Sequence, residues 1–260
     1  MRLALAFWRL LRAVVHVLHG MAVMAFRFPS LDAVGRQARI GWWARGLLRA
    51  LGIGLRLQGR LPIPAGPALL VVANHVSWLD IAAIHAVLPQ ARFVSKADVL
   101  QWPLLGWLIR GAGTLFIERE RKRDAVRVVH AMRDALAAGN TVAVFPEGAT
   151  ASGPELLPFH GNLLQAAIST ATPVLPVVLR FADAASPFSA AAPWVGDTSL
   201  LQSLWRVASA RGLCVHLDLL APVPTAQADR RHLAADLRRR IQNRLPTAEA
   251  PPGMAMADRA

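Results

Sequence analysis

The chain has one cysteine among its 260 residues, Cys214, so neither an intramolecular disulfide nor a metal site built from cysteines is available. Acidic residues are also scarce: 16 Asp and Glu against 29 Lys and Arg give a formal net charge of +13. Such a charge favours an anionic partner, namely nucleic acid, acidic lipid head groups or an acidic protein. Because 54% of the residues are apolar, we expect a membrane surface and no nucleic-acid partner.

Long uncharged runs are absent too. Within the mostly apolar segment Leu3–Phe26 the longest such run, Ala13–Phe26, has 14 residues, fewer than the roughly 20 that cross a bilayer. Basic residues recur at helical spacing and predict a polar stripe: Arg9, Arg12, His16 and His19. The opposite face is apolar and contains Leu10, Val14, Val17, Leu18, Met21 and Met24. The pattern favours a helix that lies in the membrane interface.

The following stretch, Leu31–Leu51, repeats this pattern with Trp42 and Trp43 beside arginines, which is typical of head-group depth. Two alternatives remain open: both helices pack on the protein's own core, or the first helix spans the membrane in a tilted form. A signal peptide is disfavoured because arginines interrupt the apolar run and no cleavage site of small residues follows it. We therefore predict membrane-associating helices over residues 1–51, one domain over 52–246 and a flexible tail over 247–260.

From Gly52 onward, strand-like and helix-like segments alternate, which predicts an α/β fold with a mostly parallel central sheet flanked by helices. The predicted strands are Gly54–Gln58, Ala68–Ala73, Arg92–Ser95, Thr114–Glu118, Thr141–Pro146, Val174–Phe181 and Leu213–Leu220. The predicted helices are Trp78–Leu88, Leu104–Arg110, Asp124–Ala138, Asn162–Thr170 and Asp229–Leu245.

A histidine and an aspartate five positions apart follow the second strand, in the segment Asn74–Asp80 with the sequence NHVSWLD. Open α/β sheets usually carry their chemistry at the carboxyl ends of strands. A histidine held by a carboxylate has a fixed tautomer and can take a proton from a hydroxyl group, so His75 and Asp80 are candidate catalytic residues. The alternative is structural: Ser77 and Asp80 also form the S-x-x-D pattern of a helix capping box.

Two other strand ends carry charge. Arg119 ends the strand of the segment GTLFIER, where a guanidinium could bind phosphate oxygens or cap a solvated basic turn. Glu147 and Gly148 end the strand of the segment VAVFPEG. The glycine lets a ligand approach closely, although Glu147 could equally cap a turn. Parallel strands bring these residues and the His75–Asp80 pair to one rim.

Four segments resemble, in order, the four sequence blocks of the glycerolipid acyltransferases: NHVSWLD, GTLFIER, FPEG and the VLPV of Val174–Val177. The most similar group is the bacterial 1-acyl-sn-glycerol-3-phosphate acyltransferases, and the resemblance covers roughly residues 50–225. It implies transfer of an acyl chain from acyl carrier protein or coenzyme A to the sn-2 hydroxyl of a lysophosphatidic acid, giving phosphatidic acid in phospholipid synthesis. It also implies an enzyme on the cytoplasmic face of the inner membrane, without metal or cofactor.

The resemblance assigns roles to individual residues. His75 would deprotonate the hydroxyl, Asp80 would orient His75, Arg119 would hold the phosphate, and the Glu147–Gly148 turn would shape the acceptor site. It places three further residues among the substrate contacts: Phe116, Lys96 and Thr150.

One departure bears on the acceptor. Phosphatidate-forming members usually continue FPEG with Thr-Arg, and this chain continues with Ala149-Thr150, so a phosphate-binding guanidinium is missing. Enzymes that acylate lyso-ornithine lipid or other lysophospholipids lack that pair as well, which makes such an acceptor the second hypothesis. An inactive membrane adaptor and a metal hydrolase using His75, Asp80 and His160 are weaker, the latter because the spacing fits no standard zinc pattern.

Overall fold

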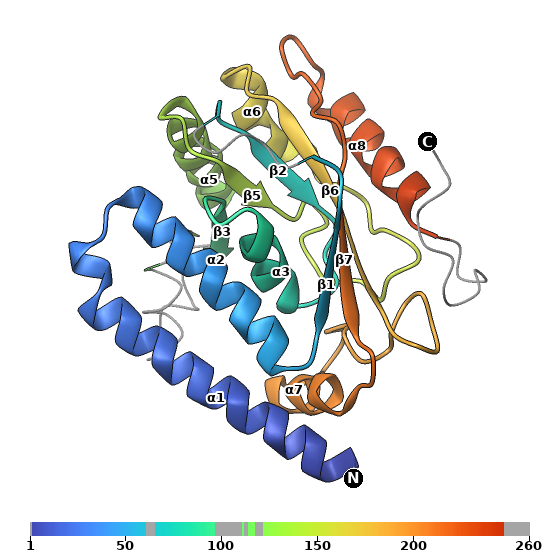
Figure 1. The fold of residues 1–260 in the computed structure, drawn as a ribbon. Coiled ribbons are helices and arrows are strands. Elements are labelled where there is room, and N and C mark those ends of the chain that lie inside the picture. Colours follow the sequence, from blue (N-terminus) through green and yellow to red (C-terminus); the bar gives the residue numbers. More distant parts are fainter. Residues whose placement is uncertain (1, 61–65, 97–110, 112–113, 118–121, 247–260) are drawn as a thin grey trace.

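A mostly parallel sheet forms the centre of the molecule (Figure 1). The structure is a computed structural model, which describes residues 2–60, 66–96, 111, 114–117 and 122–246. Within these residues the strand order is β1-β7-β6-β2-β5-β3-β4, and every neighbouring pair is parallel except β6 and β7. The strands are β1 (Gly54–Gln58), β2 (Leu70–Ala73), β3 (Arg92–Lys96), β4 (Leu115–Ile117), β5 (Val142–Val144), β6 (Val174–Ala182) and β7 (Cys214–Leu219).

Helices cover both faces of this sheet, as its apolar central strands require. All four residues of β2 are buried, and alternate residues enter two separate cores: Val71 and Ala73 one, Leu70 and Val72 the other. The first core is closed by α2 (Ala33–Ala50), α3 (Leu79–Val87) and α7 (Leu200–Ser209). The second is closed by α5 (Lys122–Ala137), η3 (Gly161–Leu164), α6 (Gln165–Ser169) and α8 (Arg230–Arg244).

These elements confirm the expected α/β fold, with local differences. The region predicted as one helix over Asn162–Thr170 divides into the 3₁₀ turn η3 and the short helix α6. Helix α7 was not predicted, and the predicted helix Leu104–Arg110 lies outside the described residues. The predicted flexible tail also lies outside them.

The N-terminal helix α1 (Arg2–Phe26), joined to α2 by the turn η1 (Phe28–Ser30), lies along α2 and α7 on the side away from the sheet (Figure 1). Arg9 donates hydrogen bonds to the carbonyls of Ala208 and Ala210, and His16 Nε2 lies 2.9 Å from the carbonyl oxygen of Trp43. Arg9 and His16 of the predicted polar stripe therefore bind the protein itself, as the alternative in which these helices pack on the protein's own core requires.

Small residues explain this orientation. Ala6, Ala13 and Gly20 alternate with Arg9 and His16 along α1 and are buried. A Cβ on Gly20 would lie 2.1 Å from the Trp43 indole nitrogen, so α1 approaches α2 closely there. Small side chains permit this approach. Of the predicted apolar face, Val14 and Leu18 point outward, whereas Val17 packs on the first core.

The outward face of α1 is rich in large apolar side chains. Five of them share one side of the helix, are between 55% and 62% exposed, and are called the outer stripe below: Phe7, Leu11, Val14, Val15 and Leu18. By length and composition Leu3–Phe26 would also suffice to cross a membrane, with a mean hydropathy of 1.4 in its most apolar window. Such a helix is weak evidence for a membrane span, since buried core helices and signal sequences have the same composition.

Candidate active site

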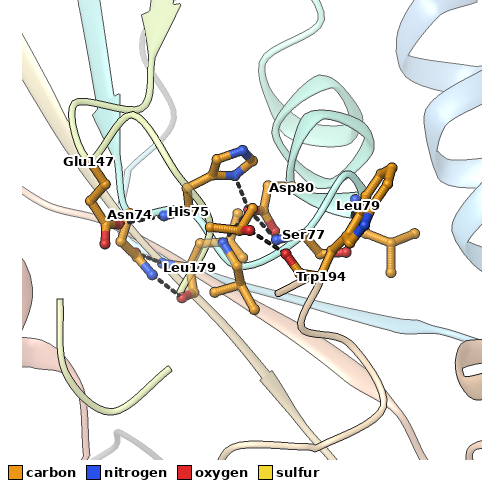
Figure 2. Close-up of polar contacts among 10 residues, drawn as sticks. Asn74, His75, Ser77, Leu79, Asp80, Glu147, Leu179 and Trp194 are labelled. Carbon is orange, nitrogen blue, oxygen red and sulfur yellow. Dashed lines mark hydrogen bonds and ion pairs between the residues drawn. The ribbon is translucent and has the colours of Figure 1, made fainter. Parts of the chain in front are cut away.

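The loop after β2 is held to the neighbouring strand by Asn74. Its side-chain amide donates to the carbonyl of Leu179 and accepts from the Leu179 N–H, both at 2.8 Å (Figure 2). Asn74 is 1% exposed, so these bonds satisfy a buried polar side chain. They fix the backbone one residue before His75, at the carboxyl end of the sheet.

His75 and Asp80 form the expected pair. His75 Nδ1 lies 2.7 Å from Asp80 Oδ2, and the Asp80 side chain is fully buried while that of His75 is 21% exposed (Figure 2). A carboxylate on Nδ1 selects the tautomer with a proton on that nitrogen and leaves the Nε2 lone pair available. No described residue binds Nε2, so the ring can take a proton from a hydroxyl group.

Asp80 Oδ2 also accepts from the backbone N–H groups of Val76 at 2.6 Å and Ser77 at 2.9 Å. One half of the predicted capping box is present, because the Asp80 carboxylate accepts from the Ser77 N–H. The other half is not, because the Ser77 hydroxyl accepts from the backbone N–H of Leu79, at 3.4 Å, and not from that of Asp80. Support of the helix start and orientation of His75 are two consequences of one carboxylate. The other oxygen, Oδ1, is buried and accepts no hydrogen bond from the described residues.

Phe145 fixes the plane of the imidazole. The two rings stack with centroids 4.0 Å apart and an angle of 9° between them, and the ring of Phe93 stacks against Phe145 with centroids 5.7 Å apart. The ring of His75 is thus held by Asp80 at one edge and by Phe145 on one face.

Glu147 joins the loop after β5 to the loop of His75. Its Oε1 accepts from the His75 N–H at 2.7 Å, and its Oε2 accepts from the Leu157 N–H at 2.8 Å. Glu147 is 4% exposed, and burial raises the pKa of its carboxyl group while the two backbone hydrogen bonds lower it. Both oxygens are engaged by the protein backbone, so Glu147 shapes the site through the position of His75.

Gly148 has a φ of +72°, the left-handed region in which glycine is favoured. A Cβ at this position would lie 3.6 Å from the ring of His160, whose backbone N–H donates to the Pro146 carbonyl at 2.9 Å. Gly148 is exposed, so the turn presents bare backbone at the rim beside His160.

Thr150 makes a contact that the sequence did not suggest. Its hydroxyl donates to the carbonyl of Trp194, in the connection between β6 and α7. The Trp194 N–H in turn donates to the Val76 carbonyl at 3.0 Å, and Ala151 N–H donates to the His75 carbonyl at 2.8 Å. Trp194 therefore ties the first and third sequence blocks together (Figure 2).

Three predicted substrate contacts remain untested. Lys96 and Phe116 lie in the paired strands β3 and β4, where only the backbone is described, and Arg119 lies outside the described residues. Among the residues that the structure describes, no group of three or more His, Cys, Asp or Glu side chains could hold a metal ion.

Comparison with known proteins agrees with this architecture. Residues 54–180 match the family model described as "Acyltransferase". A lyso-ornithine lipid O-acyltransferase of Pseudomonas aeruginosa is 37% identical over 86% of this chain and 85% of its own length. A 1-acyl-sn-glycerol-3-phosphate acyltransferase of Neisseria meningitidis is 41% identical over 74% of each chain.

Among solved structures, the fold resembles that of the 1-acyl-sn-glycerophosphate (LPA) acyltransferase PlsC from Thermotoga maritima. The TM-score is 0.68 at 22% sequence identity, over 94% of this chain and 95% of the other.

Proposed function

This chain belongs to the acyltransferase family, and from that premise we propose that it moves an acyl chain from a thioester to the sn-2 hydroxyl of 1-acyl-sn-glycerol 3-phosphate. The observation that carries the proposal is the His75 imidazole, which a buried carboxylate holds at Nδ1 and which keeps Nε2 unbound among the described residues. This arrangement suits a general base for a hydroxyl group that the substrate itself brings.

In the proposed reaction, His75 Nε2 takes the proton of the acceptor hydroxyl as its oxygen attacks the thioester carbonyl. A new C–O bond forms, the tetrahedral intermediate collapses, and the C–S bond breaks. The leaving thiolate takes the proton back from His75, so the enzyme returns to its starting state. Asp80 stabilises the imidazolium that exists between the two proton transfers.

The surrounding contacts have distinct roles in this proposal. Glu147 and Asn74 fix the backbone of His75, and Phe145 holds the imidazole plane, so a small movement of Nε2 is resisted from three directions. Arg119, Lys96 and Phe116 keep their proposed place in substrate binding, with Arg119 on the acceptor phosphate. The proposed donor is acyl carrier protein or coenzyme A carrying the acyl chain.

A second acceptor has specific support. Where phosphatidate-forming relatives usually carry an arginine, this chain has Thr150, whose hydroxyl is bonded to the Trp194 carbonyl instead of facing a ligand. The relative from Pseudomonas aeruginosa bears the name of a lyso-ornithine lipid O-acyltransferase. Because an ornithine head group carries no phosphate, the absence of this guanidinium would not weaken the binding of that acceptor.

An acceptor panel decides between these candidates. Full-length protein in vesicles would receive lysophosphatidic acid, lyso-ornithine lipid or lysophosphatidylcholine, each with acyl carrier protein and coenzyme A donors. The proposal predicts the highest kcat/KM with lysophosphatidic acid. Preference for the lyso-ornithine lipid would replace the acceptor and keep the reaction, whereas no transfer to any lysolipid would overturn the proposed function.

The proposed location is the cytoplasmic face of the inner membrane. The outer stripe of α1 supports membrane attachment, since five large apolar side chains on one side of a helix are seldom left exposed to solvent. The net charge of +13 would add attraction to anionic lipid. Insertion of the outer stripe would keep the enzyme beside its lipid acceptor.

A further inference from the structure

Three basic residues lie side by side across β1, β7 and β6. Strand register pairs Arg56 with His216 and His216 with Arg180. Paired residues project from the same face of a sheet about 5 Å apart, so the three form one row, called the cationic row below. The two guanidinium groups flank one imidazole, so each disfavours the charge of the other, and an anion bound between them would offset that repulsion.

Arg180 is the member whose burial costs most. It is 6% exposed, and its Nη1 donates to the Pro187 carbonyl at 2.7 Å, but its Nε is buried and donates to nothing among the described residues. Burial lowers the pKa of Arg180, and the charge of Arg56 lowers it further. No carboxylate in the described part of the chain forms an ion pair with either arginine. An unpaired buried donor of this kind commonly marks the position of an ion or a water molecule.

His216 between the two arginines adds a donor without adding charge. Burial, and then the charges of Arg180 and Arg56, lower the pKa of His216 to about 4. At neutral pH the imidazole is therefore uncharged and carries one N–H donor. The row thus offers two guanidinium groups and a neutral donor on one face of the sheet.

The neighbouring row toward the carboxyl end of β6 carries small residues. It pairs three small residues, Gly54, Cys214 and Ala182, none of which is fully buried. A Cβ on Gly54 would lie 3.2 Å from Cys214 Sγ, so the thiol packs against the Gly54 backbone. On the opposite side of the cationic row, Asp218 is already bonded to Arg244 and cannot neutralise the row.

From the unpaired Nε of Arg180 and the second arginine in register with it, we infer that the cationic row binds a phosphate-type oxyanion. Guanidinium groups match the geometry of phosphate oxygens, and the anion would receive a donor from Arg180, His216 and Arg56. The cationic row lies on the same face of the sheet as Val178, which belongs to the second core. Helix α3, which carries Asp80, packs on the opposite face, in the first core. The row therefore lies on the face of the sheet opposite α3, and the inference does not rest on the proposed acyl transfer. The same chemistry is offered by free phosphate, by a soluble phosphate ester and by a lipid head group.

Cys214 provides a local readout, because it is the single cysteine and lies beside the cationic row. Burial raises the pKa of its thiol, and Arg56 and Arg180 oppose that rise. A bound oxyanion would cover the thiol and cancel the effect of the arginines, which slows alkylation. The measurement is the rate of Cys214 alkylation in the full-length protein as the anion is titrated.

Three arms distinguish the sources: inorganic phosphate, adenosine 3′,5′-bisphosphate, and vesicles of anionic against zwitterionic phospholipid, all compared with chloride at equal ionic strength. We expect saturable protection of at least about tenfold in one or more arms. The protection should be lost in Arg56→Gln and in Arg180→Gln, and kept in the charge-matched control Arg60→Gln. Arg56 is exposed, so its variant tests the site even if Arg180→Gln fails to fold.

The arm that protects identifies the source of the phosphate. Three results would overturn the inference. Chloride at equal ionic strength could slow alkylation as much as the phosphate compounds do, protection could persist in both arginine variants, or no arm could protect Cys214.

Discussion

At the residue scale, single carboxylates connect several loops of the site. One oxygen of Asp80 binds the imidazole of His75 and two backbone N–H groups, and the two oxygens of Glu147 bind the backbones of His75 and Leu157. These bonds are made by charged or buried groups and are correspondingly strong. The position of His75 is therefore determined by residues from two separate sequence blocks.

Glu147→Gln tests the positioning role. Glutamine can accept one of the two backbone N–H bonds, but its NH₂ group would face the other, so the His75 loop should shift. We expect kcat to fall about tenfold or more while KM for the acceptor stays within about twofold, because Glu147 touches no substrate in this account. Steady-state kinetics with a lysolipid acceptor measure both constants.

The control is Glu155→Gln, a charge-matched change of an exposed residue in the neighbouring loop, which should leave both constants unchanged. A rise in KM for the acceptor with an unchanged kcat in Glu147→Gln would instead assign Glu147 to substrate binding.

Single residues also show where sequence reasoning reached its limit. The local pattern of Asn74–Asp80 was sufficient to place the His75–Asp80 pair, and the glycine of FPEG has the positive φ that its position required. Trp194 was missed because it acts through its backbone, and a carbonyl that accepts from Thr150 has no signature in a sequence. The side chain of Asn74 was missed as an anchor because its partner, Leu179, is 105 positions away.

At the scale of elements, every predicted strand was confirmed. Apolar runs between turns are a strong signal for buried strands such as β2 and β5, while the exposed edge strand β1 lacks such a run. The observed strands are mostly shorter, as β5 shows: Thr141–Pro146 was predicted and Val142–Val144 forms, since the residues beyond belong to the turn that presents Glu147. Helix α7 was missed although it begins with a complete capping box, Ser199 with Gln202.

The orientation of α1 could not be derived from its own sequence. An amphipathic pattern separates two faces but does not say which one packs on the protein. Arg9 is satisfied by carbonyls at the end of α7, an element that lies about 200 positions later and that was not predicted. The membrane hypothesis depends on the face that remains exposed.

The outer stripe of α1 therefore gives a prediction for this element. In the variant Phe7→Glu, Leu11→Glu, Leu18→Glu we expect loss of binding to vesicles rich in anionic lipid, by well over tenfold. Each large apolar side chain that leaves the bilayer forfeits about 1.5–3 kcal/mol of burial. Flotation of full-length protein with vesicles measures the bound fraction.

A matched control is Val126→Glu, an exposed apolar residue on α5, which packs on the other face of the sheet. Equal binding of the triple variant and the wild type would show that the outer stripe is not the anchor.

At the scale of the whole molecule, a sheet covered on both sides holds the site at one rim, while α1 lies across the outside of α2 and α7 (Figure 1). The positive charge of the chain and the outward apolar face of α1 favour the same surroundings, an anionic membrane surface. Such surroundings would concentrate the proposed anionic lysolipid and the proposed acidic carrier protein beside the His75–Asp80 pair.

Stability of the whole molecule should depend on pH through His85 in α3. Burial lowers the pKa of His85 to about 4 from 6.5. The folded protein therefore binds fewer protons than the unfolded chain between these values, so stability present above pH 6.5 is lost as the pH falls toward 4. At about 1.4 kcal/mol per pKa unit, we expect the His85 contribution to fall by about 2–3 kcal/mol between pH 7.5 and 4.5.

Urea unfolding at the two pH values measures this loss. His85→Gln should reduce the pH dependence by the His85 contribution and leave that of His216, whose pKa is also lowered to about 4, whereas His232→Gln, a change of a histidine whose side chain is 94% exposed, should not alter it. An unchanged pH dependence in His85→Gln would contradict the assignment.

The proposed general-base role of His75 is tested by acyl transfer in His75→Ala compared with the wild type. Both proteins would be assayed in vesicles under single-turnover conditions, with the lysolipid acceptor that the wild type prefers. Equal melting temperatures of the two proteins would first show that His75→Ala is folded. A general base at His75 predicts a rate at least about a hundredfold lower in His75→Ala, because alanine cannot accept the hydroxyl proton. A rate in His75→Ala equal to that of the wild type would contradict it.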